Sequence, residues 1–178
     1  MPSRIYEFDH PERFVVGTVG EPGDRTFFLQ ASAGGQVVSV ALEKGQVAAL
    51  AEGVSSLLRE AGRFPADSTA IADRAPLDAP IVEEFRVGNM SVAWTGERVI
   101  IEASADDVDV LETDDDELLT DPVIQAGGPS GMLRVSLAPE AAEAFVHRAE
   151  VVVAAGRKPC IWCGRPLDPT GHVCPRMN

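Results

Sequence analysis

Cysteine and histidine residues with the spacing of metal ligands gather near the C-terminal end of the chain. Cys160 and Cys163 form a Cys-x-x-Cys pair followed by Gly164, and a His172-x-Cys174 pair begins eight residues later. Thiolates and imidazole are the ligands that tetrahedral zinc prefers, and a Cys-x-x-Cys turn places two sulfurs on one side of an ion. We therefore expect a closed Cys₃His zinc site with the ligands Cys160, Cys163, His172 and Cys174. Four protein ligands leave no open coordination position, so the site would be structural.

Two other interpretations of the cysteines stay open at this point. A thioredoxin-like redox pair would need its Cys-x-x-Cys after a strand and at the start of a helix, which Pro159 and Gly164 do not support. Reduced thiols without a metal are the third possibility. If zinc binds, it would itself fold the segment, because a loop this short has almost no core and structural zinc contributes about 10 kcal/mol or more. Ile161 and Trp162 are expected to dock the segment on the rest of the protein, although an exposed Trp162 could instead contact a partner.

Other side chains with catalytic potential show no recognisable arrangement. The sequence contains no G-x-S-x-G, Walker, H-E-x-x-H or G-x-G-x-x-G motif. His147 lies off the apolar stripe of its helix, so we expect it to face solvent. His10 falls in the turn Asp9-His10-Pro11 near the terminus.

The segment 106–121 holds nine acidic residues and no basic one. A charge run of this kind is typical of a solvated loop. It does not match an EF-hand, which needs Gly at its sixth position and Glu at its twelfth. Asp107 and Asp109 could instead hold Mg²⁺ through a substrate phosphate, or the acidic face could dock a partner.

Charge is unevenly distributed along the 178 residues. The net charge is −13, and residues 157–178 alone carry +3, which leaves −16 on the remainder. Such an acidic chain argues against a broad nucleic-acid footprint or binding to an anionic membrane. No apolar run approaches the roughly 20 residues of a membrane span, and the first residues lack the apolar core of a signal peptide. Export and insertion into a membrane are therefore not indicated.

The hydrophobic periodicity predicts two similar halves. Strands are expected at 14–19, 25–31 and 37–42, followed by an amphipathic helix from Val47 to Ala61. Strands at 83–94, 98–103 and 132–137 follow, and then a helix that begins at Pro139. A shift of 95 residues places Val40 on Val135 and Leu50 on Phe145, which suggests an internal duplication, although any strand followed by an amphipathic helix would align similarly.

These elements predict an α+β fold: a largely antiparallel sheet built from two βββα units, with helices on one side and a small C-terminal zinc-binding loop. The expected organisation is an α+β body, residues 1–156, and a zinc-binding tail, residues 157–178. Within the body, units 1–62 and 83–156 are joined by a linker, 63–82, and the second unit contains the acidic loop, 106–121.

The opening Tyr6-Glu7-Phe8 and the ending CIWCGRPLDPTGHVCPRMN resemble an actinobacterial family labelled domain of unknown function 3090. The resemblance extends over nearly the whole chain and is most specific at 160–178. It implies a cytoplasmic bacterial protein and the same four residues as its cysteine–histidine cluster. The family label implies no activity.

Two specific functions are compatible with these features, and a purely structural role in a larger complex is a third possibility. The first is a non-enzymatic binding or adaptor protein, in which the zinc-folded tail recognises a protein partner. The second is an enzyme or regulator acting on a phosphorylated small molecule or nucleotide, with Mg²⁺ at the acidic loop and phosphate held by Arg86, Arg98 or Arg134. The second requires these arginines to converge on a cleft beside that loop. The oligomeric state stays open.

Overall fold

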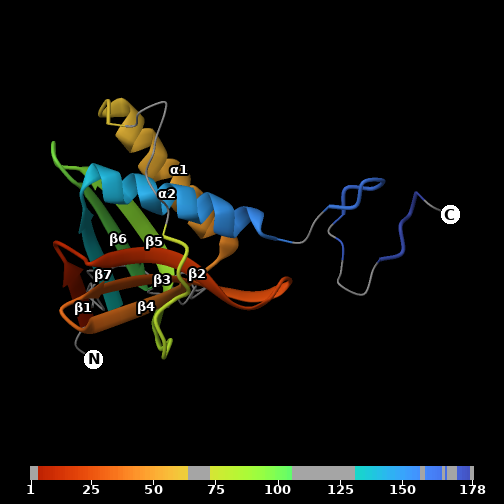
Figure 1. Ribbon diagram of the computed structural model, residues 1–178, viewed down its shortest axis with the longest axis horizontal. Helices are drawn as coiled ribbons and strands as arrows, with labels where there is room; N and C mark the ends of the chain where they lie inside the picture. The colour runs from red at the N-terminus through yellow and green to blue at the C-terminus, as the bar shows by residue number, and fades with distance from the viewer. Residues whose placement is uncertain are drawn as a thin grey trace, which may run out of the picture.

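The computed structural model describes residues 4–63, 73–105, 131–156, 159–165, 167 and 172–176 (Figure 1). Within these ranges the chain forms one seven-stranded sheet and two helices. In chain order the elements are β1 (Arg4–Phe8), β2 (Arg13–Glu21), β3 (Asp24–Ala33), β4 (Gln36–Leu42), α1 (Lys44–Glu60), β5 (Glu83–Trp94), β6 (Val99–Ala105), β7 (Gly131–Leu137) and α2 (Pro139–Ala154). None of the helices in these ranges has the length and apolarity needed to cross a membrane.

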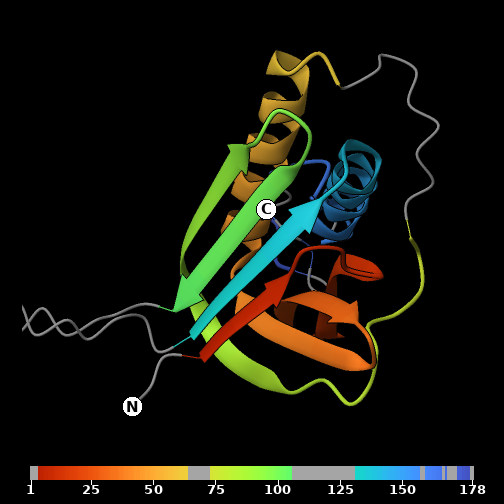
Figure 2. The same cartoon turned by 90° about the vertical axis from the view of Figure 1, so that its left-hand side faces the viewer.

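The sheet is mixed but mostly antiparallel, with the strand order β1-β7-β6-β5-β4-β3-β2. The pairs β2–β3, β3–β4, β5–β6 and β6–β7 are antiparallel, whereas β4–β5 and β1–β7 are parallel. Figures 1 and 2 show α1 and α2 side by side on one face of the curved sheet. The predicted α+β class, with helices on one side, is confirmed.

The two halves repeat one topology, β2-β3-β4-α1 and then β5-β6-β7-α2. The repeat extends to the pairing register, because each second strand faces its third strand through equivalent residues: Leu29 with Val40, and Ile101 with Val135. It also extends to sequence, since Gln-Ala-Ser-Ala at 30–33 occupies the place of Glu-Ala-Ser-Ala at 102–105. The parallel pair β4–β5 joins the two units into one sheet.

Strand β1 was not among the predicted elements. It pairs with β7 from Arg4 opposite Gly131 to Phe8 opposite Val135. Only Phe8 of its five residues is buried, so the strand carries too little alternation to be recognised. Its partner lies far along the chain, and only the folded sheet brings the two together.

Helix α1 follows the predicted apolar stripe. Its buried residues are Val47, Leu50, Ala51, Val54 and Leu58. The helix begins with a capping box, in which the backbone N–H of Glu43 donates to the Gln46 side chain at 2.7 Å. It ends where Gly62 takes a φ of +65°, a left-handed conformation that glycine adopts without a steric penalty.

Helix α2 begins at Pro139, as predicted, and packs Phe145 against Phe14 of β2 with ring centroids 4.8 Å apart. At its other end, Arg25 Nη2 of β3 donates to the carbonyl oxygen of Ala155 at 2.9 Å. A cation at this end complements the negative pole of the helix dipole. The exit of α2 toward the C-terminal segment is thereby attached to the sheet.

Residues 73–82 contain no helix or strand, but they are attached to the sheet by polar contacts. Asp73 accepts hydrogen bonds from Arg13 of β2 and from Arg148 of α2. Arg148 is buried and also donates to the carbonyl oxygen of Val16 at 2.6 Å. The hydrogen bond from Arg13, with further contributions from the backbone N–H of Ala75 and the charge of Arg148, lowers the pKa of the Asp73 carboxyl. This part of the predicted linker is therefore held firmly against β2 and α2.

Candidate metal centre

The four predicted ligands come together in the C-terminal segment. The sulfurs of Cys160, Cys163 and Cys174 and one ring nitrogen of His172 all lie within 4.8 Å of one another. The sulfurs of Cys160 and Cys174 are 3.9 Å apart, and Cys163 Sγ lies 3.2 Å from His172 Nε2. Cys160 and Cys174 are buried, whereas Cys163 and His172 are half-buried.

The Cys-x-x-Cys turn is built by its own backbone. The N–H of Cys160 donates to the carbonyl oxygen of Arg165 at 2.7 Å, and the N–H of Gly164 donates to the carbonyl oxygen of Cys160 at 2.8 Å. Gly164 has a φ of +71°, which a side chain would make unfavourable. This closure turns both sulfurs of the pair toward the same point.

Backbone N–H groups of the turn also favour the thiolate form of Cys160. Hydrogen bonds from the N–H groups of Cys163 and Trp162 lower the pKa of this thiol, and the Trp162 nitrogen lies 3.4 Å from the sulfur. Metal ligation requires a deprotonated thiol. The turn therefore stabilises the charge state that a metal ion needs.

Two of the ligand separations lie close to those of a tetrahedral site, and all of them lie within 4.8 Å. With Zn–S bonds of about 2.3 Å and Zn–N bonds of about 2.0 Å, tetrahedral angles place ligand atoms about 3.5–3.8 Å apart. The observed 3.9 Å and 3.2 Å fall close to that range. A disulfide would need about 2.05 Å, and all three cysteines are free thiols. A Cys₃His group is thus positioned to bind a metal ion.

The redox interpretation finds no support in this geometry. A thioredoxin-like pair begins a helix, whereas the described residues between 159 and 176 lie in turns and irregular backbone, with one bridge residue at Pro159. The four ligand atoms form one group instead of an isolated pair of sulfurs.

Apolar side chains between the ligands point outward. Ile161 is 88% exposed, Trp162 57% and Val173 83%. The expectation that Ile161 and Trp162 dock the segment on the body is therefore wrong, and the alternative of an exposed Trp162 agrees with the structure. The physical reason is that the ligands occupy the small interior, which leaves only the outside for the residues between them. Val173 was not among the predicted functional residues; its position between His172 and Cys174 is the signal that could have identified it.

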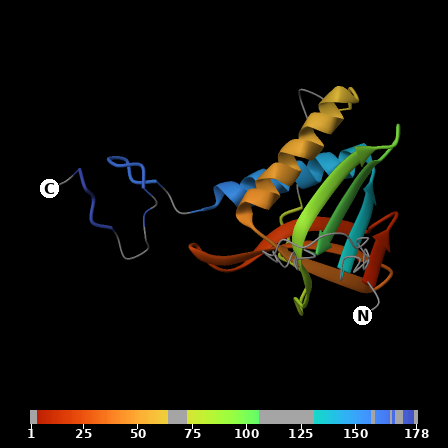
Figure 3. The ribbon, with the colours of Figure 1, turned by 180° about the vertical axis from the view of Figure 1, so that it is seen from behind.

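Figures 1 and 3 place the described residues between 159 and 176 beyond the C-terminal end of α2, away from the sheet.

The arginines of the alternative function do not converge. Arg98 donates to Ser136 Oγ at 2.7 Å and to two backbone carbonyls, at the end of β6 opposite to Ala105. Arg134 pairs with Glu102 across β6 and β7 at 3.6 Å. Arg86 pairs with Glu43 at 3.1 Å, near the start of α1. The condition that the phosphate-binding hypothesis required is therefore not met by these three residues, and the acidic segment 106–121 lies outside the described residues.

The remaining histidines are not at the cluster. His10 is exposed in the turn after β1. The expectation that His147 faces solvent holds only in part, because its side chain is half-buried. Its ring nitrogens lie 3.9 Å from carboxylate oxygens of Glu143 and Glu150 on the same helix.

Comparison with known proteins assigns the chain to a family. A search of curated proteins and a search of solved structures each found no match. A family model described as "Protein of unknown function (DUF3090)" matches residues 6–174, a range that contains all four residues of the Cys₃His group. The chain therefore belongs to the DUF3090 family.

Proposed function

We propose that this protein is a non-enzymatic binding protein whose C-terminal segment folds around a structural zinc ion and presents an apolar surface to a protein partner. The observation that carries the proposal is the pairing of two features in one short segment. Four ligand atoms lie within 4.8 Å of one another, and three apolar side chains between those ligands face solvent. We call the exposed side chains of Ile161, Trp162 and Val173 the tail surface.

The donor set favours zinc over other metals. Thiolate and imidazole ligands in a tetrahedral arrangement are typical of zinc, whereas Mg²⁺ and Ca²⁺ prefer oxygen ligands. Zinc, when bound, would cross-link Cys160, Cys163, His172 and Cys174. Because these four side chains complete a tetrahedron, the site supports a structural role. The thiols must stay reduced, which agrees with a cytoplasmic location.

The composition of the segment supports a protein partner. Aromatic and arginine side chains are enriched at the centres of protein interfaces, and the C-terminal segment exposes Arg165 and Arg176 as well as Trp162 of the tail surface. The net charge of −13 on the whole chain argues against a nucleic-acid ligand.

Metal analysis of protein purified without a histidine tag tests the zinc site. Wild-type protein is expected to contain about one zinc per chain. His172→Gln and Cys163→Ser should lose the zinc, while His10→Gln, which removes an exposed histidine away from the cluster, should retain it. Wild-type protein without zinc, or a His172→Gln protein that keeps it, would refute the proposed site.

A further inference from the structure

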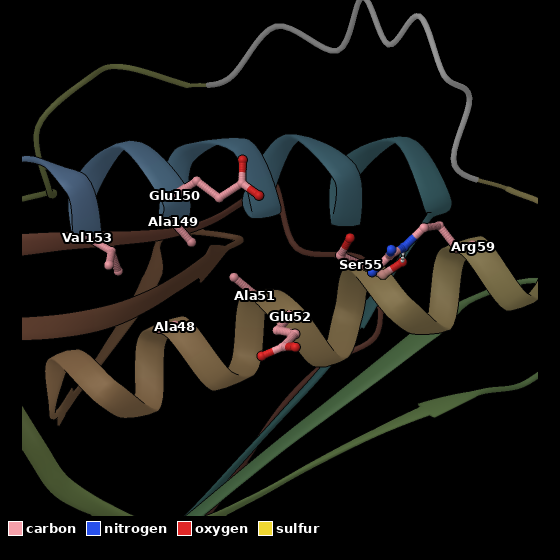
Figure 4. Close-up of a pocket in the computed structure, with 8 residues that line it drawn as sticks. All are labelled: Ala48, Ala51, Glu52, Ser55, Arg59, Ala149, Glu150 and Val153. Atoms are coloured by element: carbon pink, nitrogen blue, oxygen red, sulfur yellow. Dashed lines mark hydrogen bonds between the residues drawn. The ribbon is translucent and has the colours of Figure 1, made fainter.

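A small hollow lies between the two helices on the side away from the sheet. Its volume is about 240 Å³. Figure 4 shows Ala51 of α1 and Ala149 and Val153 of α2 pointing into it. Ala48 lines the same end as Val153. We call this hollow the α1–α2 groove. Pockets for cofactors and small ligands measure roughly 300–1,000 Å³, so the groove is suited to one large side chain instead.

Charged side chains also line the groove. Glu52 of α1 and Glu150 of α2 line it, and both are exposed. Arg59 lines it as well and donates to Ser55 and Ser56 of its own helix. Lys44 and Arg25 lie beside Gly156, beyond Val153. The lining is therefore apolar at Ala51, Ala149 and Val153 and, with two acidic side chains and one basic one, carries a net charge of −1.

The tail surface has the complementary character. Trp162 is a large apolar side chain with a single N–H donor, and exposed Arg165 and Arg176 belong to the same segment. Residues 157–178 carry +3 and the rest of the chain −16. Opposite charges of this kind orient two surfaces as they meet.

We propose that Trp162 of one copy of this protein occupies the α1–α2 groove of a second copy, with the tail arginines beside Glu52 and Glu150. This inference names the partner in the proposed function and rests on it. When each copy inserts its tail into the other, the two contacts close a symmetric dimer. A one-way contact would leave a free tail and a free groove, so reciprocal exchange is the arrangement that satisfies both surfaces.

The structure favours a second copy over insertion into the same chain. On α2 the groove is lined by Ala149, Glu150 and Val153, which lie close to the end of the helix at Ala154. The hydrogen bond from Arg25 to Ala155 fixes the exit of α2, and Figures 1 and 3 place the described residues 159–165 beyond it, away from both helices. To enter its own groove, the segment would have to reverse direction within a few residues.

The test compares the association of zinc-loaded full-length variants by analytical ultracentrifugation. Wild-type protein is expected to form a dimer. Trp162→Ala and Ala48→Glu should each weaken dimerisation by about thirtyfold or more, the effect of removing a central interface residue. Ala49→Glu is the matched control, because Ala49 is exposed beside Ala48 but does not line the groove; it should dimerise like wild type.

Mixing the two defective variants identifies which copy supplies each part. An equimolar mixture of Trp162→Ala and Ala48→Glu contains one intact tail and one intact groove per pair. Each mixed pair therefore keeps one of the two contacts, whereas a pair of identical variants keeps neither, so heterodimers should form in preference to either homodimer. In a Trp94→Phe background, which leaves Trp162 as the only tryptophan, the fluorescence of Trp162 should shift to shorter wavelength on dimerisation.

Three results would overturn the inference: a wild-type dimer unaffected by Trp162→Ala, a mixture that forms no heterodimer, or a wild-type monomer. A monomer whose Trp162 emission shifts in Ala48→Glu would indicate insertion into the same chain. Zinc content, measured in every sample, separates this failure from failure of the proposed function, because a zinc-loaded monomer contradicts only the dimer, whereas zinc-free wild-type protein contradicts the metal site itself.

Discussion

Replacing Cys163 by serine should unfold the C-terminal segment and leave the sheet and its two helices almost as stable as before. The substitution removes one of four ligands, whose sulfur lies 3.2 Å from His172 Nε2. Structural zinc sites contribute about 10–16 kcal/mol to the folding of small metal-binding segments. Since the apolar side chains of this segment face outward, we expect no other source of comparable stability within it.

The exposed fractions of the side chains in the C-terminal segment set an upper limit on the stability that the sheet and helices can lose. Ile161 and Val173 are more than four-fifths exposed, so neither can contribute much by burial. Trp162 is 57% exposed, which leaves roughly 100 Å² of it covered if a buried tryptophan accounts for up to about 250 Å². At about 25 cal/mol per Å², that area corresponds to about 2.5 kcal/mol even if the body supplied all of the cover. The loss in the body should therefore stay below that value.

Two measurements on the same sample separate the segments. Nuclear magnetic resonance spectra of ¹⁵N-labelled protein should show the amide signals of the C-terminal segment collapsing to random-coil positions in Cys163→Ser, together with the Trp162 indole signal. The Trp94 signal and the other dispersed amide signals should persist. Calorimetry should find the main unfolding transition within a few degrees of wild type.

Trp162→Ala is the matched control, because it changes a neighbouring side chain that is not a ligand and should keep both the zinc and the dispersed signals. Loss of the whole dispersed spectrum in Cys163→Ser, or a fall of ten degrees or more in the main transition, would refute the reasoning and show that the metal-bound segment is integral to the core.

Three further predictions concern the body. Asp73→Asn should lower the free energy of unfolding in urea by about 1–3 kcal/mol, because the buried guanidinium of Arg148 loses its counter-charge. This is less than the usual cost of breaking a buried ion pair, because the Asp73 side chain is 37% exposed and its charge is partly screened by water. Asp78→Asn, which removes a more exposed partner of Arg13, should cost clearly less, and equal losses would contradict the role of Arg148. The pKa of Asp73 is lowered in the folded state, so its stabilising contribution should be full above its ordinary pKa of about 3.9 and be lost as the pH falls through the lower folded value; an unchanged acid-unfolding profile in Asp73→Asn would argue against it. Phe145→Ala should cost about 3–5 kcal/mol, because it empties a fully buried position, and thermal unfolding at an unchanged temperature would show that this position is not packed as described.

The sequence predicted best those elements whose determining contacts are between residues close along the chain. The apolar stripe of α1 repeats every three or four residues, so Val47, Leu50 and Val54 had to share one face. Pro139 began α2 as its fixed backbone angle predicts. The apolar stripe of α2 did not predict that Glu143 and Arg148 are also buried. Arg148 is buried by contacts with Val16 and Asp73, which lie far away in sequence.

Two features that hydrophobic periodicity did not predict, strand β1 and the attachment of the segment after α1, depend on contacts between residues far apart in sequence. β1 carries little alternation and acquires its partner only when β7 is in place. The segment after α1 shows no periodicity, yet Gln30 holds it through the backbone of Asp78, with hydrogen bonds of 2.7 and 3.0 Å. Such contacts depend on the positions of backbone groups that no local pattern records.

The sequence by itself determined the repeated strand and helix order and the four residues of the Cys₃His group, because helix periodicity, strand alternation and ligand spacing are all local properties of the chain. Tertiary structure decided how the halves join, since the parallel pairing of β4 with β5 needs both units folded. It also decided which side chains face out. Ligand atoms that converge on one point fill the interior of a short segment, so Ile161, Trp162 and Val173 remain on its surface.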